Sequence, residues 1–286
     1  MIQRAASSTF FPILLVLASI LGQQLGASLG ATQFDRVGPQ GVVLMRLLFS
    51  AVIMVAILRP SIARLGPSQW RTIIGLGITM SGMNLMIYEA FNRIPQGVAV
   101  TIEALGPLAL SVIAGRRWVG ALWAALAFTG IVLLGRDGFS AGGLDPVGVL
   151  FALGAAACWA GFILMNREAG RHFPGVAGLA LAMCAGTAVA APFGIATGGT
   201  ELLNPWVIAV GVGIALLSSA IPYGIETHVL RLMPASTFAM LTCLSPAMAA
   251  LTAFVVLGQA LVWVDLVAIG CVMLACAGAV RTRPPL

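Results

Sequence analysis

The chain has 286 residues, of which 60% are hydrophobic and only 8% are charged, whereas soluble domains carry about a quarter charged residues. Its 15 basic residues, all arginine, exceed its 9 acidic residues and give a formal net charge of +6. So few charges exclude a water-soluble globular domain and predict an integral membrane protein. The arginines lie singly or in pairs between apolar segments, so the positive charge indicates membrane topology and no nucleic-acid partner.

Apolar segments of about 20 residues, the length that crosses ~30 Å of hydrocarbon, recur along the chain between short turn-like breaks. We therefore predict an all-α integral membrane protein with ten transmembrane helices. The predicted spans cover residues 10–31, 39–58, 70–91, 96–114, 117–135, 146–166, 175–197, 205–228, 235–256 and 260–280.

The first two predicted spans carry amides and one deep charge. Gln23 and Gln24 lie inside the first span, and Arg46 lies inside the second. Charged residues within a membrane span face the protein interior or water. We interpret Arg46 as a structural charge that hydrogen-bonds carbonyl groups or pairs with an acid such as Glu103 or Glu89.

The third and fourth spans hold the most informative polar residues. Asn84 and Tyr88 are four residues apart and share one helix face. Glu103 precedes Pro107 by four residues at the predicted mid-depth of the membrane, where a carboxyl group costs roughly 2.5–3.5 kcal/mol by insertion scales. Three roles stay open for Glu103: a proton carrier, a partner for a substrate ammonium group, or a protonated structural hydrogen-bond donor.

Polar and aromatic residues also lie within the spans of the second part of the chain. Trp159 is in the middle of the sixth span, and Ser218 and Ser219 precede Tyr223 in the eighth. Any single amide or hydroxyl can instead be a helix-packing contact worth about 0.6 kcal/mol. Taken together they predict a modestly polar substrate site made of Gln24, Asn84, Tyr88, Glu103, Trp159, Tyr223, Thr242 and Ser245.

The chain repeats its own pattern at an offset of 139 residues. Pro95 and Pro107 correspond to Pro234 and Pro246, with eleven residues between the prolines in both cases. We predict two five-helix halves, residues 1–140 and 141–286, that together form one transport domain. Because five is odd, the second half crosses in the opposite sense, as in an inverted repeat. Pro107 and Pro246 are predicted to break their helices near the midplane and to act in gating.

The arginines are distributed unequally between the two sides of the predicted membrane. With the amino terminus inside, eleven arginines fall on the inner side and three, Arg36, Arg93 and Arg136, fall on the outer side. The positive-inside rule therefore places both termini in the cytoplasm. The inner arginines are Arg4, Arg59, Arg64, Arg71, Arg116, Arg117, Arg167, Arg171, Arg231, Arg281 and Arg283.

Sequence motifs of known enzyme classes are absent, with no HExxH, GxSxG or Walker pattern. The five cysteines all lie in apolar stretches without a CxxC pair or a nearby histidine, so we expect buried thiols and neither metal nor cofactor. We expect no catalytic residue. A membrane-embedded enzyme or a channel remains the alternative from a different functional class.

Two long segments resemble a known family. NLMIYEAFNRIPQGVAVTIEALGPLAL (84–110) and SSAIPYGIETHVLRLMPASTFAMLTCLSPAMAALTAFVVLGQAL (218–261) are similar to EamA-type exporters of the drug/metabolite transporter superfamily. The resemblance is closest to the threonine/homoserine exporters and more distant to the aromatic amino-acid exporters. That branch usually has an acid just before the second midplane proline, where this chain has Ser245.

The resemblance implies a multi-pass secondary transporter of the bacterial inner membrane. It would export amino acids and related metabolites, with broad specificity, by alternating access. A zwitterionic substrate would place its ammonium group at Glu103 and its carboxylate at backbone N–H groups, Asn84, Gln24 or Tyr223. The partners expected are a small-molecule substrate and the lipid bilayer, with proton coupling left open. An exporter of cationic drugs with the same fold is the second candidate.

Overall fold

The computed structural model describes residues 3–62, 65–115, 118–134, 144–173, 177–229, 232–233 and 235–281, and its elements are all helical within those ranges. The predicted boundary between the halves, at residues 140 and 141, lies outside the described residues, as does Pro234. The same holds for six of the arginines used for topology: Arg64, Arg116, Arg117, Arg136, Arg231 and Arg283.

The first part of the chain forms six helices. They are α1 (Gln3–Ala31), α2 (Phe34–Leu58), α3 (Pro67–Phe91), α4 (Gln96–Glu103), α5 (Leu105–Gly115) and α6 (Trp118–Leu134). The remainder forms α7 (Pro146–His172), α8 (Ala177–Gly198), the 3-10 turn η1 (Gly199–Leu203), α9 (Pro205–Ala215), the π-helical turn η2 (Leu216–Ala220), α10 (Ile221–Val229), α11 (Ala235–Thr242), α12 (Ser245–Leu257) and α13 (Trp263–Arg281).

Among the described residues, eight helical segments are long and apolar enough to cross a membrane. They correspond to eight of the ten predicted spans. The other two predictions, 96–114 and 117–135, fall on the pair α4 and α5 and on α6, which has 17 residues. The multi-pass, all-helical class is therefore established for the described residues, while the number ten is not.

The second half shows clearly why helices begin where they do. Pro146 and Pro205 occupy first-turn positions, where the missing N–H costs nothing. The residue before each proline caps the helix: Asp145 Oδ1 accepts from the Val147 N–H at 2.9 Å and Asn204 Oδ1 accepts from the Trp206 N–H at 3.0 Å. Such caps satisfy backbone donors that have no partner within the helix.

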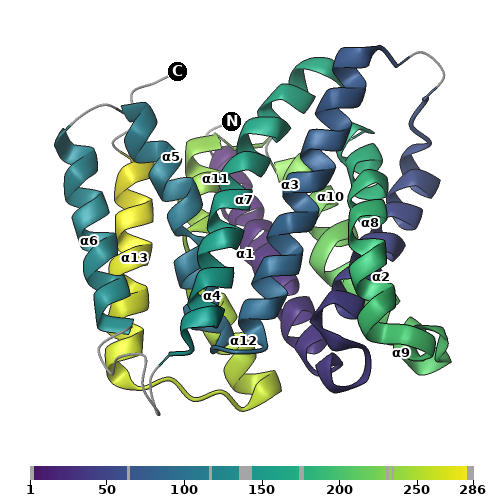
Figure 1. Cartoon of the computed structure of the whole chain (residues 1–286). Coiled ribbons are helices and arrows are strands. Elements are labelled where there is room, and N and C mark those ends of the chain that lie inside the picture. The colour runs from purple at the N-terminus through teal and green to yellow at the C-terminus, as the bar shows by residue number, and fades with distance from the viewer. Residues whose placement is uncertain are drawn as a thin grey trace.

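The helices pair along their lengths: α2 with α8, α3 with α7, and α6 with α13 (Figure 1). Glycine permits the close approach. A Cβ atom on Gly77 of α3 would lie 2.8 Å from the Ala182 carbonyl oxygen and 2.9 Å from the Gly186 nitrogen of α8. Backbones that approach this closely gain dispersion contacts, which drive helix association where lipid removes the hydrophobic driving force.

Two helices of the bundle are interrupted at similar places. α4 ends at Glu103 and α11 ends at Thr242, and in each case a new helix follows within three residues. Pro107 and Pro246 lack the N–H that would bond the carbonyl four residues earlier, which is that of Glu103 and Thr242 respectively. Each interruption therefore lies one helical turn before its proline.

The start of α1 and the end of α13 lie at the same end of the bundle, which is also where α3 begins (Figure 1). The main buried core includes Leu47, Ile73, Leu76, Met80 and Tyr88, from α2 and α3. This core holds α2 and α3 in fixed register and so positions the polar residues that they carry.

Candidate functional site

Arg46 lies at the middle of α2 and joins three elements. Its Nη1 donates to the Tyr88 hydroxyl of α3 at 3.3 Å, its Nη2 to the Ser218 carbonyl oxygen at 3.3 Å, and its Nε to Ser219 Oγ at 3.4 Å. The guanidinium carbon also lies 5.8 Å from the centre of the Tyr88 ring, which adds a cation–π contact. These partners are all uncharged, so the positive charge of Arg46 is solvated by dipoles.

Tyr88 is held rigidly for this contact. Its side chain is fully buried, with ring centroids 6.0 Å from Phe34 and 5.4 Å from Phe91. Gly30 of α1 packs on the ring, because a Cβ there would lie 3.1 Å from a ring carbon. The phenol is therefore oriented by packing, and Arg46 receives a fixed acceptor.

The two serines that contact Arg46 belong to the π-helical turn η2. Ser218 and Ser219 are 1% and 2% exposed, at the junction of α9 and α10. π-Turns inside helices occur frequently at functional sites because they redirect backbone groups. Here the turn aims the Ser218 carbonyl oxygen at the Arg46 guanidinium.

Glu103 is the last residue of α4 and is 8% exposed. It lies within electrostatic range of Arg46 and of Cys158 on α7. None of the ion pairs formed between described residues joins Glu103 to Arg46 directly. Among the described residues, Glu103 and Arg46 are thus electrostatic neighbours that form no direct ion pair.

Gln24 belongs to a buried polar cluster that joins α1, α4 and α12. The Gln96 amide nitrogen donates to the Gln24 carbonyl oxygen at 3.2 Å and to Gln24 Oε1 at 3.4 Å. Ser28 Oγ bridges Gln96 Oε1 at 2.8 Å and Thr252 Oγ1 at 3.0 Å. Sequence reasoning missed Gln96, Ser28 and Thr252, although all three are polar residues within predicted spans.

A second acid, the half-buried Glu226 of α10, is bound from α1. Gln23 Nε2 donates to Glu226 Oε1 at 2.7 Å, and Ser19 Oγ donates to the same oxygen at 3.3 Å. Tyr223, one turn earlier on α10, lies within electrostatic range of both Glu226 and Arg46. Tyr223 is therefore close enough to respond to both Arg46 and Glu226.

Three predicted site residues hydrogen-bond within their own segments. Asn84 Nδ2 donates to the Met80 carbonyl oxygen at 2.8 Å, and Thr242 Oγ1 donates to that of Ala239 at 2.8 Å. Ser245 Oγ donates at 2.7 Å to the Thr242 carbonyl oxygen, which is the group left without its usual donor by Pro246. These contacts give the three residues a structural role in this conformation.

Trp159 of α7 packs beside a small buried cluster that includes Leu108 of α5 and Cys276 of α13. Its side chain remains half-buried. The structure thus brings Arg46, Tyr88, Glu103 and Tyr223 into one electrostatic neighbourhood, while Gln24 and Trp159 border other contacts.

Both ends of the bundle are tied by polar contacts. At the end where α3 finishes, Arg93 pairs with Asp145 at 3.3 Å and with Glu89 at 3.9 Å, and Glu89 also accepts from Gln40 of α2. The Val147 N–H and then Arg93 hold the pKa of Asp145 below its usual range. These contacts fasten α2, α3 and α7 together.

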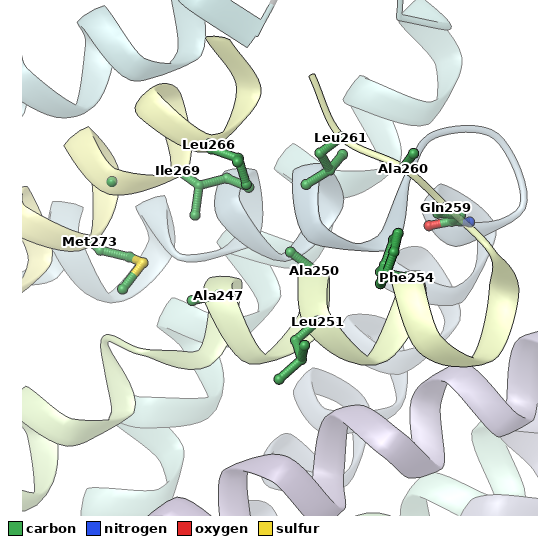
Figure 2. A pocket seen from close by; sticks show the side chains of 11 residues that line it. Ala247, Ala250, Leu251, Phe254, Gln259, Ala260, Leu261, Leu266, Ile269 and Met273 are labelled. Atoms are coloured by element: carbon green, nitrogen blue, oxygen red, sulfur yellow. The ribbon is translucent and has the colours of Figure 1, made fainter. Parts of the chain in front are cut away.

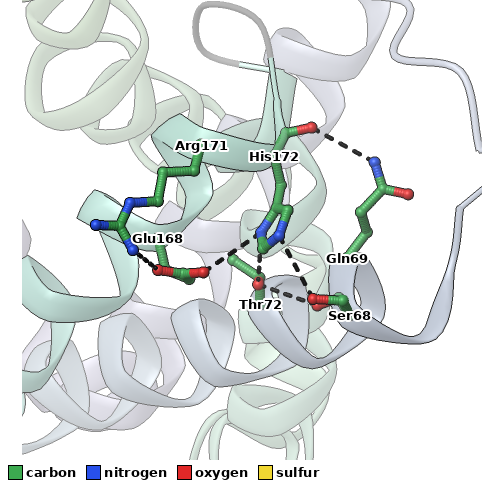
Figure 3. A network of polar contacts seen from close by, with 6 residues as sticks. All are labelled: Ser68, Gln69, Thr72, Glu168, Arg171 and His172. Atoms are coloured by element: carbon green, nitrogen blue, oxygen red, sulfur yellow. Dashed lines mark hydrogen bonds and ion pairs between the residues drawn. The ribbon is translucent and has the colours of Figure 1, made fainter.

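At the opposite end, α3 begins beside the end of α7 (Figure 3). The His172 ring lies between Ser68 Oγ, 3.4 Å from Nε2, and Thr72 Oγ1, 3.3 Å from Nδ1. Glu168 Oε1 is 3.9 Å from the same Nδ1 and pairs with Arg171 at 2.9 Å. A polar tie therefore closes each end of the α3–α7 pair.

A pocket of about 410 Å³ lies between α12 and the beginning of α13 (Figure 2). Its lining is almost entirely apolar, with Gln259 as its amide; Gln259 Oε1 also accepts from the Gln96 N–H at 3.0 Å. None of the substrate-site residues predicted from the sequence lines this pocket. It is thus separate from the Arg46 and Glu103 region.

Comparison with known proteins adds independent findings. Residues 146–281 match the model of the EamA-like transporter family. The threonine/homoserine exporter RhtA of Escherichia coli (strain K12) is 34% identical over 273 residues, covering 96% of this chain and 92% of that protein. The RhtA of Salmonella typhimurium (strain LT2) is 33% identical over the same extent. A solved crystal structure at 19% identity covers 94% of this chain with a TM-score of 0.60, which supports the fold alone.

Proposed function

This chain belongs to the EamA-like transporter family, and we propose that it exports amino acids of the threonine and homoserine type, with broad specificity, across the bacterial inner membrane. Similarity to RhtA exporters extends over nearly the whole of both chains. Transport of a small molecule explains why ionisable residues, Arg46 and Glu103, lie inside the predicted spans of a chain without the sequence motifs of known enzyme classes.

The observation that carries the proposal is the placement of Glu103 near Arg46. Each is an ionisable side chain at membrane depth, where insertion costs roughly 2.5–3.5 kcal/mol by insertion scales. Such residues mark substrate or ion pathways. The Glu103 carboxylate suits a substrate ammonium group, and the surrounding hydroxyl and aromatic side chains suit the remainder of a small amino acid.

We further propose two inverted five-helix halves, residues 1–140 and 141–286, with ten crossings and both termini in the cytoplasm. Three observations support this arrangement: α2 packs on α8, α6 on α13, and α4 on α12. Each contact joins a predicted span of one half to the corresponding span of the other, since α4 lies in the fourth predicted span and α12 in the ninth, as expected for an axis in the membrane plane.

Alternating access would then rock the halves about the interrupted helices. The breaks after Glu103 and Thr242 provide hinges, with Pro107 and Pro246 fixing their positions. The ties at the two ends of α3 and α7 would open alternately, first at Arg93 and Asp145 and then at His172. Proton coupling would use Glu103, whose buried carboxyl group can carry a proton when no substrate is bound.

Proteoliposomes containing the purified chain test the proposal. We expect labelled threonine and homoserine to enter protein-containing vesicles faster than empty ones, and a cationic dye to enter no faster. Movement of the dye without amino-acid movement would favour the cationic-drug exporter, and movement of neither would refute both. An imposed pH gradient, acid inside, that drives threonine accumulation in exchange for protons would establish the proton coupling that export requires.

A further inference from the structure

We propose that Arg46 binds the carboxylate of the transported amino acid, with the guanidinium held in place by Tyr88 of α3 and by the π-turn serines Ser218 and Ser219. This inference rests on the proposed amino-acid export and names the group that recognises the substrate's acidic end. It replaces the structural interpretation of Arg46 drawn from sequence.

The guanidinium has unused donor capacity. Arginine carries five N–H groups, and Arg46 donates through Nε, Nη1 and Nη2 once each. One hydrogen on Nη1 and one on Nη2 thus have no partner among the described residues. Two N–H groups from the two terminal nitrogens form the fork that binds a carboxylate in bidentate fashion.

The existing bonds of Arg46 are also weak enough to adjust. All three are 3.3–3.4 Å long, beyond the usual 2.7–3.2 Å for N–H···O bonds. The side chain is only half-buried although it lies at the middle of α2. A purely structural arginine at this depth should saturate its donors with short bonds, because unpaired donors are costly there.

The turn that holds Arg46 contains a further unsatisfied group. Among the described residues, the Ser218 hydroxyl has no hydrogen-bond partner although Ser218 is 1% exposed. It packs against Gly26 of α1, where any Cβ would collide with it. Buried unpaired hydroxyls are uncommon and indicate a group that acquires a partner in another state. A carboxylate bound at Arg46 would bring an acceptor to this turn.

The alternatives considered for the carboxylate are less suited. The Asn84 amide is 3% exposed and already donates to Met80 at 2.8 Å. Gln24 accepts from Gln96 through its carbonyl oxygen and Oε1, so only its uncharged amide N–H groups could meet a carboxylate. Arg46 keeps two N–H groups without a partner among the described residues and has a full positive charge, and it lies within electrostatic range of Glu103. An amino acid could bridge the two, with its ammonium at Glu103 and its carboxylate at Arg46.

The test compares threonine with threoninol, which keeps the ammonium and side chain but lacks the carboxylate. Binding is measured by ligand-induced thermal stabilisation of the purified protein, and transport by competition against labelled threonine in proteoliposomes. For the wild-type protein we expect threonine to bind at least tenfold more tightly than threoninol. In R46K, which keeps the charge but loses the fork, we expect this preference to fall to less than threefold, with threoninol binding unchanged.

Two further variants separate recognition from folding. Arg36→Gln removes an exposed arginine of the same helix, α2, and should preserve the preference. Ser218→Ala, which keeps the Ser218 carbonyl contact with Arg46, should weaken threonine binding alone. Equal binding of threonine and threoninol by the wild-type protein would overturn the inference, as would an equal loss of both ligands in R46K together with a lower melting temperature.

The two proposals fail separately in this design. Tight, carboxylate-dependent binding of threonine without any transport would refute the exporter and retain the role of Arg46. Threonine transport in which threoninol competes as well as threonine would retain the exporter and refute the role of Arg46.

Discussion

Glu103 and Thr242 are the final residues of α4 and α11, and each precedes a proline by four residues. They are also separated by 139 residues, the offset that relates the two proline pairs. The same backbone chemistry thus ends two helices at corresponding places. The side chains differ, because Glu103 supplies a carboxyl group where Thr242 supplies a hydroxyl that bonds its own helix. The helix interruption before a proline therefore occurs in both halves, whereas the carboxyl group occurs only in the first.

Replacing the proline tests whether the break serves transport. Pro107→Ala restores a backbone N–H that can bond the Glu103 carbonyl, a gain of about 1 kcal/mol in unfolding free energy. We expect a more continuous helix, an unchanged or higher melting temperature, and at least a severalfold slower transport of threonine. Pro192→Ala, at an exposed position inside α8, is the control and should leave transport unchanged. Unchanged transport in Pro107→Ala would show that the break is a static kink.

The carboxyl group of Glu103 is tested by Glu103→Gln, which keeps its shape and removes its charge. A charge-assisted hydrogen bond is worth about 1.5–3 kcal/mol, so we expect the KM for threonine to rise about tenfold or more. The melting temperature should stay close to that of the wild type, because the neutral amide has the shape of the protonated carboxyl group and also supplies a donor and an acceptor. The control is Glu201→Gln, at an exposed residue of η1. Equal rates for wild type and Glu103→Gln at every pH would exclude both the ammonium and the proton role.

Close packing behind the broken helix predicts a stability defect. A Cβ at Gly106 would overlap the Ala156 carbonyl oxygen and lie 2.9 Å from the Ala156 carbonyl carbon of α7. Gly106→Ala should therefore lower the unfolding free energy by about 1–3 kcal/mol, the usual cost of overpacking. Gly213→Ala has open space and should be neutral or stabilising by up to about 1 kcal/mol. Thermal unfolding in detergent measures both, and similar melting temperatures for the two variants would contradict the packing described.

The cap at Asp145 predicts a dependence of stability on pH. The Val147 N–H and Arg93 lower the pKa of Asp145 in the folded chain, so the ionised carboxylate favours folding. This stabilisation is present at neutral pH and is lost as the pH falls through the lowered pKa. Asp145→Asn keeps a capping oxygen but cannot ionise. We expect the wild type to melt at a slightly higher temperature than Asp145→Asn at pH 7, with the difference shrinking below about pH 4. A difference that stays constant with pH would exclude this contribution.

Composition and the recurrence of apolar segments were sufficient to predict an all-helical, multi-pass membrane protein. Eight of the predicted spans appear as helices of membrane-crossing length, because a run of apolar residues in lipid must satisfy its backbone groups internally. The prolines at 107 and 246 predicted interrupted helices for the same kind of local reason. The two shorter predictions, at 96–114 and 117–135, are split or brief in the structure, and apolarity alone does not distinguish a broken helix from a continuous one.

The candidate site depended on contacts between distant segments. From sequence, Arg46 was equally consistent with a pairing to Glu89 or Glu103, whereas Glu89 is occupied by Arg93 and Gln40 at one end of the bundle. Asn84 shares a helix face with Tyr88, yet its amide bonds its own backbone. Ser28, Gln96 and Thr252 were overlooked because a single hydroxyl or amide carries no local signal of its partner.

The amino-acid sequence by itself determined three properties: that this chain is a membrane protein, which segments form helices, and that the helices containing Pro107 and Pro246 are interrupted. These properties depend on residues near each other along the chain. Only the tertiary structure decided that Arg46 rests on Tyr88 and the π-turn serines, with Glu103 nearby. Helix packing determines these contacts, because the partners are up to 173 residues apart in the sequence and meet only when the helices associate.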